Sequence, residues 1–369
     1  MTATETPVEP APTASPDIDV RIGSIRYVDN QSSALDHSWH VVALSDEIGS
    51  DPVQVWLLGK AWLLARTPRE LLAFEDRCPH RLAPLSAGVV VGDRIRCGYH
   101  GWEFGVDGRC ELIPSNGRGA PIPPRACVTK PYAVQERFGL VWVAPAEPVC
   151  DLHEFPEWDD PAYDRARNEP RRTNAGAGQL ADNFLDVAHF PTVHTQTFGT
   201  PEAAYVSPHT VSREGWEIRT VYEAPYRNHD DPLVSTGDHP LVQPHILTKV
   251  GRPFAAVYLT LDFPVTGVRL AILFACQAER HGSTRVYKLM AHSGHHGHPE
   301  RMDELIRYED LVLDEDLAIL ERYPDQRLAV DLSAEVHARS DRLSVAYRRL
   351  LSDLVQHALA SPSDAYPGR

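Results

Sequence analysis

The segment CPHRLAPLSAGVVVGDRIRCGYHGW, residues 78–102, contains two short clusters of metal-binding residue types. Cys78 precedes His80 by two positions, and after sixteen further residues Cys97 precedes His100 by three. Each cluster therefore offers one thiolate and one imidazole. Such a set can hold a tetrahedral zinc ion, or a [2Fe–2S] centre in which two histidines replace two cysteines on one iron.

The spacing within the clusters distinguishes these possibilities. Structural zinc sites usually separate paired ligands by two to four residues and keep like ligands together, so a C-x-H half-site fits zinc poorly. The segment resembles the Rieske family, whose motif is C-x-H-x15–17-C-x2-H. Three neighbouring residues also match that family: Arg81, Gly101 and Trp102. The resemblance implies that the two cysteines bind one iron and the two histidines bind the other, with structural zinc as the alternative.

The composition along the chain indicates two domains between short tails. Residues 1–24 are rich in Pro, Thr, Ala and Glu and lack aromatic residues, so we expect a disordered tail. Short apolar runs broken by Gly, Pro, Asp and Asn predict a small antiparallel β domain over residues 25–148. A Pro- and Asp-rich stretch marks its boundary with a second domain at 149–361, and residues 362–369 form a C-terminal tail.

The second domain combines strand and helix patterns. WEIRTVYE alternates, with Trp216, Ile218 and Tyr222 on one face, and three later apolar runs predict further strands. From Asp341 onward, apolar residues recur at helical spacing as far as Ala358, which predicts a long amphipathic helix against the sheet. The expected fold class is therefore α+β.

The segment QLADNFLDVAHFPTVHTQTF, residues 179–198, predicts a second metal site. On a continuous helix, His189 and His194 would diverge by about 140°. Pro191 lies between them and disfavours helical geometry at Phe190, so we expect the helix to be interrupted there and both imidazoles to face one ion. Non-haem Fe(II) oxygenases bind their iron through two histidines and one carboxylate.

The segment RYEDLVLDEDLAILERYPDQ, residues 307–326, contains the candidate carboxylates. An acidic run of this kind is usually a solvated helix face. Together, however, the two segments resemble Rieske oxygenases in which N-x-x-D-x-x-H-x4-H is followed, over a hundred residues later, by E-D-x4-E. That resemblance implies that Asp316 is the third iron ligand, with Asp310 as the fallback.

The same resemblance implies roles for two residues that precede the histidines. Asp186 is expected to bridge a Rieske histidine of a neighbouring subunit and an iron-ligand histidine, so that electrons cross between chains. An ionised carboxylate between two imidazoles fixes their tautomers and couples proton to electron movement. Asn183 shares a helical face with Asp186, and the resemblance places it close to the iron. The alternative for Asp186 is an ordinary surface aspartate.

The charge and the remaining motifs restrict the partners. A net charge of −15 over 369 residues argues against a nucleic-acid surface. We find no signal peptide or membrane-spanning run, and expect a cytoplasmic protein without a membrane partner. No dinucleotide or flavin motif is present, so electrons must come from other proteins. Arginines around the clusters predict a positive patch for an acidic donor, or are simply solvated: Arg77, Arg81, Arg94 and Arg96.

The resemblance extends over nearly the whole chain after the first tail, and is strongest to the O- and N-demethylase branch of the Rieske oxygenases. It implies a Rieske domain beside a helix-grip catalytic domain, a head-to-tail homotrimer, and a ferredoxin or ferredoxin reductase as electron donor. The expected activity is dioxygen-dependent hydroxylation or oxidative demethylation of a small, ring-containing substrate. The alternatives are a Rieske electron carrier without oxygenase activity and a zinc-stapled helix-grip binding protein. No motif identifies the substrate.

Overall fold

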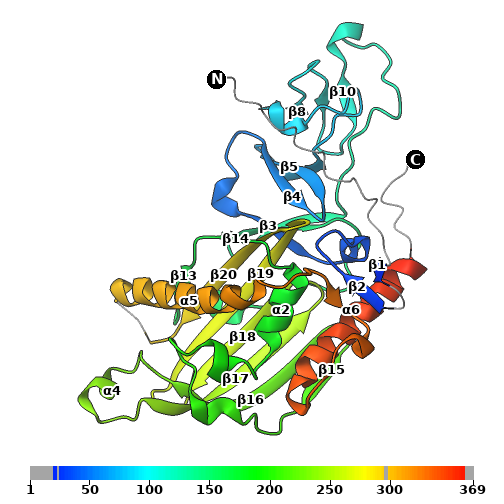
Figure 1. Ribbon diagram of the computed structural model, residues 1–369. Coiled ribbons are helices and arrows are strands. Elements are labelled where there is room, and N and C mark those ends of the chain that lie inside the picture. Colours follow the sequence, from blue (N-terminus) through cyan, green and yellow to red (C-terminus); the bar gives the residue numbers. More distant parts are fainter. Residues whose placement is uncertain (1–19, 23–24, 295–297, 362–369) are drawn as a thin grey trace, which may run out of the picture.

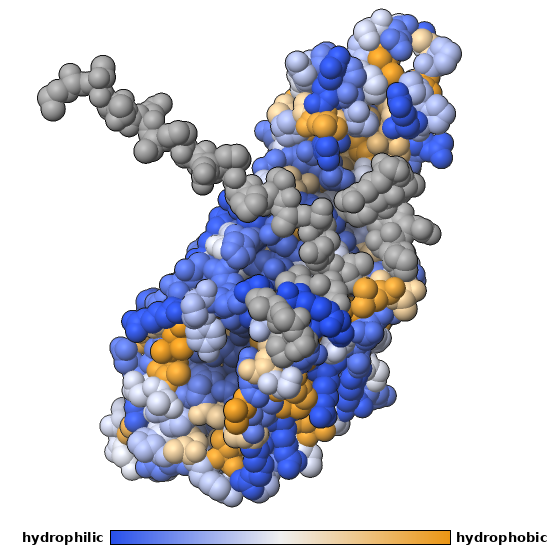
Figure 2. Space-filling view, turned by 45° about the vertical axis from the view of Figure 1, so that its right-hand side comes forward, coloured by the Kyte–Doolittle hydropathy of each residue, from blue (hydrophilic) through white to orange (hydrophobic). Residues whose placement is uncertain are grey.

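The protein folds into two parts, which lie one above the other in Figure 1. This computed structural model describes residues 20–22, 25–294 and 298–361. Every strand pairing within these ranges is antiparallel. Figure 2 shows that hydrophilic residues cover most of the visible face and that hydrophobic ones form small patches, as expected when most large apolar side chains are buried in the core.

The upper part contains two small sheets with a shared interior. One sheet joins β4 (Val53–Leu57), β5 (Lys60–Arg66) and β6 (Leu71–Glu75). The other joins β7 (Val89–Val91), β8 (Arg94–Arg96), β9 (Glu103–Phe104) and β10 (Cys110–Leu112). Their common apolar cluster includes Leu63, Phe74, Leu85, Ile95 and Phe104. This cluster supports the loops that carry the cysteines and histidines of the first motif.

A third sheet connects the two parts. It consists of β3 (His40–Leu44), β11 (Ala133–Arg137) and β12 (Leu140–Ala144). Val41 and Trp142 from this sheet belong to the same apolar cluster as Leu273 and Tyr287 from the large sheet below. The connecting sheet therefore closes one face of the lower part.

The lower part is built on one large antiparallel sheet in the order β13-β20-β19-β18-β17-β16-β15, with β14 also paired to β20. Its first three strands by sequence are short: β13 (Asp164–Arg167), β14 (Arg171–Thr173) and β15 (Val211–Glu214). The five long strands form its centre: β16 (Glu217–Arg227), β17 (Val242–Arg252), β18 (Ala256–Phe263), β19 (Val268–Arg280) and β20 (Ser283–His292). Four of the five coincide with predicted strands, whereas β17, which contains Pro244, was not expected.

The central strand β19 shows why its sequence is apolar almost throughout. Ile272 and Phe274 point to the helix-covered face, while Leu273 and Ala275 point to the face covered by the connecting sheet. A strand buried on both faces needs apolar residues at every position rather than at alternate ones. The sheet is therefore the middle layer of the lower part.

Three long helices and the short α4 cover or border the sheet of the lower part. They are α2 (Ala177–Leu185), α4 (Pro232–Thr236), α5 (Pro299–Leu320) and α6 (Arg342–Ala360). In Figure 1, α5, α2 and α6 cover the same side of the sheet, and α2 contacts both other helices. The predicted C-terminal helix is confirmed, because α6 buries Leu343, Tyr347, Leu350, Leu354 and Ala358. The remaining short elements are α1 (Pro156–Asp159), α3 (Phe190–Val193) and 3-10 turns at 33–37, 45–47, 85–87, 114–116, 201–204, 332–334 and 339–341.

The N-terminal segment lies against the lower part rather than the upper one. Within the expected tail of residues 1–24, Val20–Ile22 form β1, which pairs with β2 (Ile25–Val28), and β2 pairs with β21 (Leu328–Ala329). The other residues of that tail, and the tail at 362–369, lie outside the described residues. The buried side-chain amide of Asn30 donates to the carbonyl oxygen of Ser283 and accepts from the Ala177 amide, which anchors the segment to β20 and α2.

Candidate functional site

The two clusters of the first motif lie on two loops with the same backbone pattern. The Cys78 amide donates to Ala83, and the Leu82 amide donates back to the Cys78 carbonyl, at 2.9 Å each. The Cys97 amide donates to Trp102 at 2.8 Å, and the Gly101 amide to the Cys97 carbonyl at 3.0 Å. The fifth residue of each loop is left-handed, with φ of 61° at Leu82 and 72° at Gly101. This conformation is costly for leucine and easy for glycine, which indicates that the loop geometry is required.

The side chains of these loops form a thiol pair and an imidazole pair. Both cysteines are 2% exposed, whereas His80 is half-buried and His100 is exposed. The histidine ring centroids are 4.5 Å apart, and Trp102 stacks on His80 at 4.5 Å. Burial raises the pKa of the Cys78 thiol to about 11, so a thiolate here at neutral pH requires the charge of a bound metal.

The separation into pairs argues against a single zinc ion. Ligand atoms around tetrahedral zinc lie about 3.3 to 3.8 Å from one another. Among the described residues, the only group of three or more ligand atoms within 4.8 Å of each other belongs to the second motif. The four residues of the first motif therefore suit a centre with two metal ions, one for each pair, and the buried Nδ1 of His80 has no hydrogen-bond partner that would hold the ring for another purpose.

The arginines around the first motif do not form one free positive patch. Arg94 and Arg96 lie 3.3 and 2.7 Å from the carboxylate of Glu103, which is only 3% exposed. Arg77 and Arg81 are exposed. Two of the four arginines therefore pair with a buried glutamate beside the cluster loops, and Arg77, Arg81 and Arg96 are exposed to a partner.

The second motif lies where α2 ends and α3 begins. The helix does stop before the second histidine, but it stops at Leu185 with Asp186 as its extended C-cap, rather than at Pro191. Phe190, expected to be displaced from helical geometry, is the first residue of α3. Proline is tolerated in the first turn of a helix, where its missing amide would have no partner, so Pro191 starts a helix here. The prediction of an interrupted helix holds, but the position of the break was wrong.

This break brings three ligand atoms into a triangle. The Nε2 atoms of His189 and His194 are 3.1 Å apart, and Oδ1 of Asp316 lies 3.5 and 3.4 Å from them. Bonds of about 2.1 Å at right angles around one ion would separate ligand atoms by about 3 Å. Asp316 is 3% exposed, and its Oδ1 accepts no hydrogen bond. A buried carboxylate oxygen without a donor, facing two imidazole nitrogens, fits a metal ion.

Two further carboxylates orient the imidazoles of this triangle. Oδ2 of Asp186 lies 2.7 Å from Nδ1 of His189, and Oε2 of Glu315 lies 3.1 Å from Nδ1 of His194. Because a carboxylate accepts the Nδ1 proton, each Nε2 keeps its lone pair for the ion. Burial lowers the pKa of His194, which also favours the neutral ring. Glu315 is part of the predicted E-D-x4-E motif, but the sequence alone did not indicate that it contacts His194.

Asp186 is ionised in spite of its burial. Desolvation works against the charge, but the hydrogen bonds from His189 and the Ala188 amide, together with nearby Lys249, lower the pKa of Asp186 to about 2. The side chain is still 25% exposed, at the edge of a surface hollow that also includes Tyr323 and Val336. The carboxylate therefore contacts His189 from the side that a neighbouring molecule can reach.

The fallback ligand Asp310 is not part of the triangle. Asp310 precedes Asp316 by six positions on α5, which turns it about 120° away around the helix. Its Oδ1 instead accepts a hydrogen bond of 2.7 Å from Asn168. Of the two acidic candidates, only Asp316 reaches both histidines.

Lys249 is a functional residue that the sequence did not indicate. It lies on β17, is 2% exposed, and donates hydrogen bonds of 2.6 Å to the carbonyl oxygens of Phe184 and Asp186. These carbonyls belong to the end of α2, where backbone oxygens lack partners within the helix. The lysine thus fixes the end of the helix that positions Asp186 and His189.

The triangle opens into a small apolar cavity of about 70 Å³, referred to below as the inner cavity. Aromatic and aliphatic side chains make up most of its wall, including Phe190, Phe198 and Leu247. The Nδ2 of Asn183, at its edge, is buried and has no hydrogen-bond partner among the described residues. His245 donates from Nδ1 to the Ala224 carbonyl, and burial lowers its pKa to about 4, so its Nε2 is a neutral acceptor.

This fold and these two groups define a class of protein: a metal-dependent oxidoreductase with a two-cysteine, two-histidine centre on a β domain and a two-histidine, one-carboxylate centre beneath a helix-covered sheet. Residues 38–132 match the Rieske [2Fe-2S] domain, and residues 173–357, half of the chain, match the vanillate O-demethylase oxygenase C-terminal domain. The chain belongs to the Rieske oxygenases of the vanillate O-demethylase type.

Individual relatives agree with this family. Methylxanthine N1-demethylase NdmA of Pseudomonas putida is 28% identical over 89% of this chain and 91% of its own length. The oxygenase component of dicamba O-demethylase from Stenotrophomonas maltophilia is 32% identical over 51% of this chain and 56% of its own. The structure of NdmA from P. putida CBB5 with caffeine superposes with a TM-score of 0.78 at 26% identity, covering 90% of this chain and 94% of that one.

The expected fold and class are therefore confirmed. The protein is the terminal oxygenase component of a Rieske system, an oxidoreductase that takes electrons from a reductase or ferredoxin and acts on a small molecule. The electron carrier and the zinc-stapled binding protein are not favoured. In the described part of the chain, no helix combines the length and apolar character needed to cross a membrane.

Proposed function

We propose that this oxygenase oxidatively demethylates a small, ring-containing substrate that bears an N-methyl or O-methyl group, at a mononuclear iron held by His189, His194 and Asp316. The observation that carries the proposal is the triangle of ligand atoms with edges of 3.1 to 3.5 Å, whose buried Asp316 oxygen has no donor. The relatives named as N1-demethylase and O-demethylase support demethylation over other oxidations.

The two metal groups supply electron storage and dioxygen activation when bound. Cys78, Cys97, His80 and His100 would hold the cluster, and the half-buried His80 and exposed His100 would lie on the side that a partner can reach. Asp186 and Glu315 keep the Nδ1 protons of the two iron-ligand histidines and so direct each Nε2 inward. The protein thus contributes ligands whose orientation is fixed by hydrogen bonds to Asp186 and Glu315.

The inner cavity selects and orients the methyl group. Its apolar wall excludes water, and the neutral Nε2 of His245 accepts a hydrogen bond from a polar group of the substrate. The unpartnered amide of Asn183 donates towards the reacting position. Hydroxylation of a methyl carbon on nitrogen or oxygen gives an unstable product that releases formaldehyde, whereas hydroxylation of a ring carbon would give a stable alcohol.

Asp186 is proposed to receive a cluster histidine of a neighbouring copy in a head-to-tail homotrimer. In Figure 1 the sheet that carries β8 lies at the top of the molecule, and α2 and α5 lie well below it on the far side of β3, so the two proposed centres of one copy lie in different parts of the chain. Asp186 is ionised, contacts His189, and borders a surface hollow. A carboxylate in this position can join two imidazoles across a subunit boundary.

The first test is the EPR spectrum of the anaerobically reduced, iron-loaded protein with nitric oxide added. We expect a Rieske signal together with a high-spin ferrous nitrosyl signal. In a separate assay with dioxygen and an electron donor, a methylated substrate should release one formaldehyde for each methyl group removed. A Rieske signal without the nitrosyl signal would refute the assignment of the iron to His189, His194 and Asp316.

Replacing Asp186 by Asn tests the bridge. The variant should bind both metals, since Asp186 is not a proposed ligand, but turn over about 10- to 100-fold more slowly, because the amide oxygen can still accept from His189 but carries no negative charge. Single-turnover reduction of the iron by the cluster, followed by absorbance, is the measurement. Wild-type rates in a fully loaded variant would remove Asp186 from the electron path.

A further inference from the structure

The second cluster loop, residues 97–102, is closed at its base by a pair of oppositely charged side chains. Arg96 ends β8, Glu103 begins β9, and the two residues are direct partners across this antiparallel pair of strands. Directly opposed residues of antiparallel strands have Cα atoms about 4.5 to 5.5 Å apart. Arg96 and Glu103 therefore flank, and hold together, the two ends of the loop that carries Cys97 and His100.

Glu103 is a buried carboxylate with two arginine partners. Its side chain is 3% exposed, and its Oε1 accepts from Nε of Arg96 at 2.8 Å. Nη1 of Arg94 lies 3.3 Å from the other oxygen, and 3.7 Å from the half-exposed carboxylate of Glu111. The side chains of Arg94 and Arg96 are 40% and 45% exposed. The carboxylate of Glu103 thus lies beneath two partly solvated cations, which offset the cost of burying it.

The first cluster loop also has a buried carboxylate at its base, but without a lysine or arginine partner among the described residues. Asp76, two positions before Cys78, is 6% exposed. Its oxygens accept from the Ser86 amide at 2.7 Å, and from the Ser86 hydroxyl and the Gln54 side-chain amide at 2.6 Å each. Neutral donors therefore suffice to hold a carboxylate beside a cluster loop. The arginines at Glu103 supply positive charge in addition to hydrogen bonds.

Both members of the Arg96–Glu103 pair are close neighbours of the proposed cluster ligands. Arg96 immediately precedes Cys97, whose amide donates to the Trp102 carbonyl oxygen at 2.8 Å. Glu103 immediately follows Trp102, and the ring of Trp102 stacks on that of His80 with centroids 4.5 Å apart. The pair therefore lies next to a proposed ligand of one iron and next to a ring that packs on a proposed ligand of the other.

A fixed charge near an iron–sulfur cluster changes the free energy of its reduction. Reduction adds one negative charge, and net charge is one of the factors that set the potential of such a cluster. A nearby cation stabilises the reduced form, and a nearby carboxylate destabilises it. Water and salt screen a buried charge less than an exposed one. Each charge of the pair should therefore influence the potential, with opposite sign.

We propose that Glu103 and Arg96 are positioning residues that hold the second cluster loop and set the reduction potential of the cluster, which the Glu103 carboxylate lowers and the Arg96 guanidinium raises. The proposal rests on a cluster at the four residues of the first motif. It goes beyond the proposed demethylation, because it concerns how electrons enter the protein and not which substrate they oxidise.

The variants Glu103→Gln and Arg96→Gln test the proposal, because they weaken the same pair but change the charge in opposite directions. The full-length, cluster-loaded protein is titrated anaerobically at fixed pH and ionic strength, with the visible absorbance and the Rieske EPR signal as readouts. At the midpoint potential of the wild type, Glu103→Gln should raise the ratio of reduced to oxidised cluster about two- to tenfold. Arg96→Gln should lower that ratio by a similar factor.

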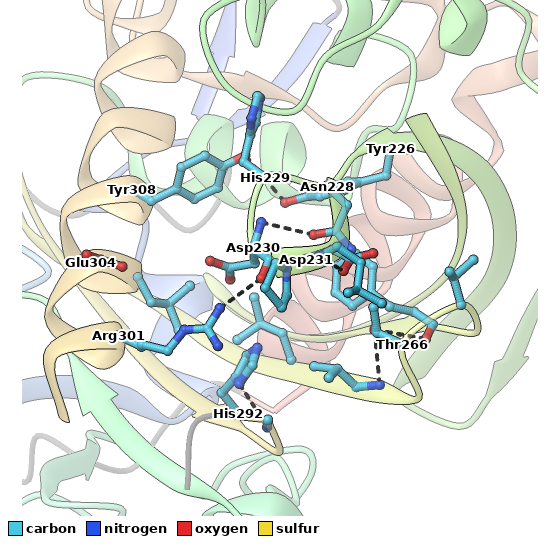
Figure 3. A pocket seen from close by; sticks show the side chains of 18 of the residues that line it. Tyr226, Asn228, His229, Asp230, Asp231, Thr266, His292, Arg301, Glu304 and Tyr308 are labelled. Carbon is cyan, nitrogen blue, oxygen red and sulfur yellow. Dashed lines mark hydrogen bonds between the residues drawn. The ribbon is translucent and has the colours of Figure 1, made fainter. Parts of the chain in front are cut away.

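Three further variants separate charge from loop structure. Arg96→Lys keeps the charge but loses the forked hydrogen bonds, so its ratio should stay within about twofold of the wild type. Arg109→Gln is the matched surface control, because Arg109 is 82% exposed and its partner Asp107 is 58% exposed. Arg301→Gln is the remote control. Figure 3 shows Arg301 on α5, in the lower part, where it donates to the Asp230 carbonyl oxygen at 2.9 Å. Both controls should leave the ratio unchanged.

Opposite shifts in the two Gln variants are the expected result. Shifts in the same direction, or no shift in either variant, overturn the proposal, because the pair would then only support the loop. If Glu103→Gln does not retain the cluster, Arg96→Gln and Arg96→Lys decide, and equal shifts in these two exclude an effect of charge. A wild-type protein loaded with iron and sulfide that gives no Rieske signal refutes the cluster assignment instead. None of these outcomes affects the proposed iron site, which the nitrosyl signal reports.

Discussion

Glu315 illustrates how a residue next to a proposed metal ligand can control the geometry of the site. Its two carboxylate oxygens accept from Nδ1 of His194, the Thr197 hydroxyl and the Gln196 amide, at 3.1, 2.6 and 2.9 Å. These three donors share one buried acceptor, so the orientation of His194 depends on it. The neighbouring Asp316 instead directs its Oδ1 towards the Nε2 atoms of His189 and His194, where the proposed metal ion would lie.

Glu315→Gln should lower the affinity of the mononuclear site for iron by about 10- to 100-fold, because one of the three donors loses its acceptor and His194 loses its fixed tautomer. The measurement is iron retained per chain after dialysis against a chelator, with the visible absorbance of the Rieske cluster as an internal standard. Asp314→Asn, an exposed position one residue away on α5, is the control. Equal iron retention in the two variants would contradict the role of Glu315.

Arg348 is a buried cation whose removal should be costly. It is 6% exposed, donates to Asp182 at 2.6 Å, and so connects α6 with α2. Arg348→Leu leaves the Asp182 carboxylate buried without its partner, and should reduce the free energy of unfolding by about 3 to 5 kcal/mol. Urea denaturation followed by circular dichroism measures the loss.

Two variants separate this cause from a packing defect. Glu335, the other partner of Arg348, is 46% exposed. Glu335→Gln should therefore lower the free energy of unfolding by less than about 1 kcal/mol. Adding Asp182→Asn to Arg348→Leu removes the unpaired charge and should restore part of the stability. No recovery in the double variant would show that lost packing, not charge, causes the destabilisation.

At the scale of elements, the end of α2 depends on a residue from a different element. Lys249 on β17 donates to the carbonyl oxygens of Phe184 and Asp186, and burial lowers its pKa from 10.5 to about 8. A continuous helix through this region would use those carbonyls internally. The buried ammonium therefore stabilises the break that lets His189 and His194 converge.

The pH dependence of stability should report the charge on Lys249. Between pH 8 and about 10.4, the lysine of the unfolded chain still binds its proton whereas the folded one has lost it, so the stability of the wild type rises with pH relative to Lys249→Met. Below pH 8 the difference should be constant. Urea midpoints of both proteins from pH 7 to 10.4 provide the test, and a difference that falls with rising pH would exclude the lowered pKa.

At the scale of the whole molecule, the two proposed metal centres lie in different parts of one chain. The connecting sheet of β3, β11 and β12 lies between the cluster loops and the iron ligands (Figure 1). The apolar cores of the two parts are continuous through Val42, Val141 and Val143, so the parts do not close on each other. Electron transfer between the centres is therefore proposed to occur between copies.

Mixed assemblies test this directly. A Cys78→Ser chain keeps the iron ligands and an Asp316→Ala chain keeps the cluster, and each alone should be inactive. Refolded or co-expressed in equal amounts, the two chains should regain roughly a quarter of the wild-type activity, the share of head-to-tail contacts that pair an intact cluster with an intact iron site. No activity in verified mixed trimers would place the transfer within one chain.

The parts of the site that lie close together in sequence were predictable. The spacing of Cys78, His80, Cys97 and His100 indicated the cluster, because ligand pairs on two short loops leave little freedom of geometry. The helix break between Asp186 and His194 was also foreseen, although its position was not, because Pro191 has opposite effects inside a helix and in its first turn. Features that depend only on residues close together in the chain can therefore be predicted from the sequence alone.

The sequence by itself determined the order of the two domains and the apolar faces of the sheet and of α6, and it predicted the ligand types, because each depends on short-range spacing and burial. Only the tertiary structure decided the partners that come from distant positions. Glu315 meets His194 across 121 residues, Lys249 meets Phe184 across 65, and the wall of the inner cavity comes from helices and strands that have no common sequence pattern. Pairing of this kind depends on how the sheet and helices pack together, which no local pattern specifies.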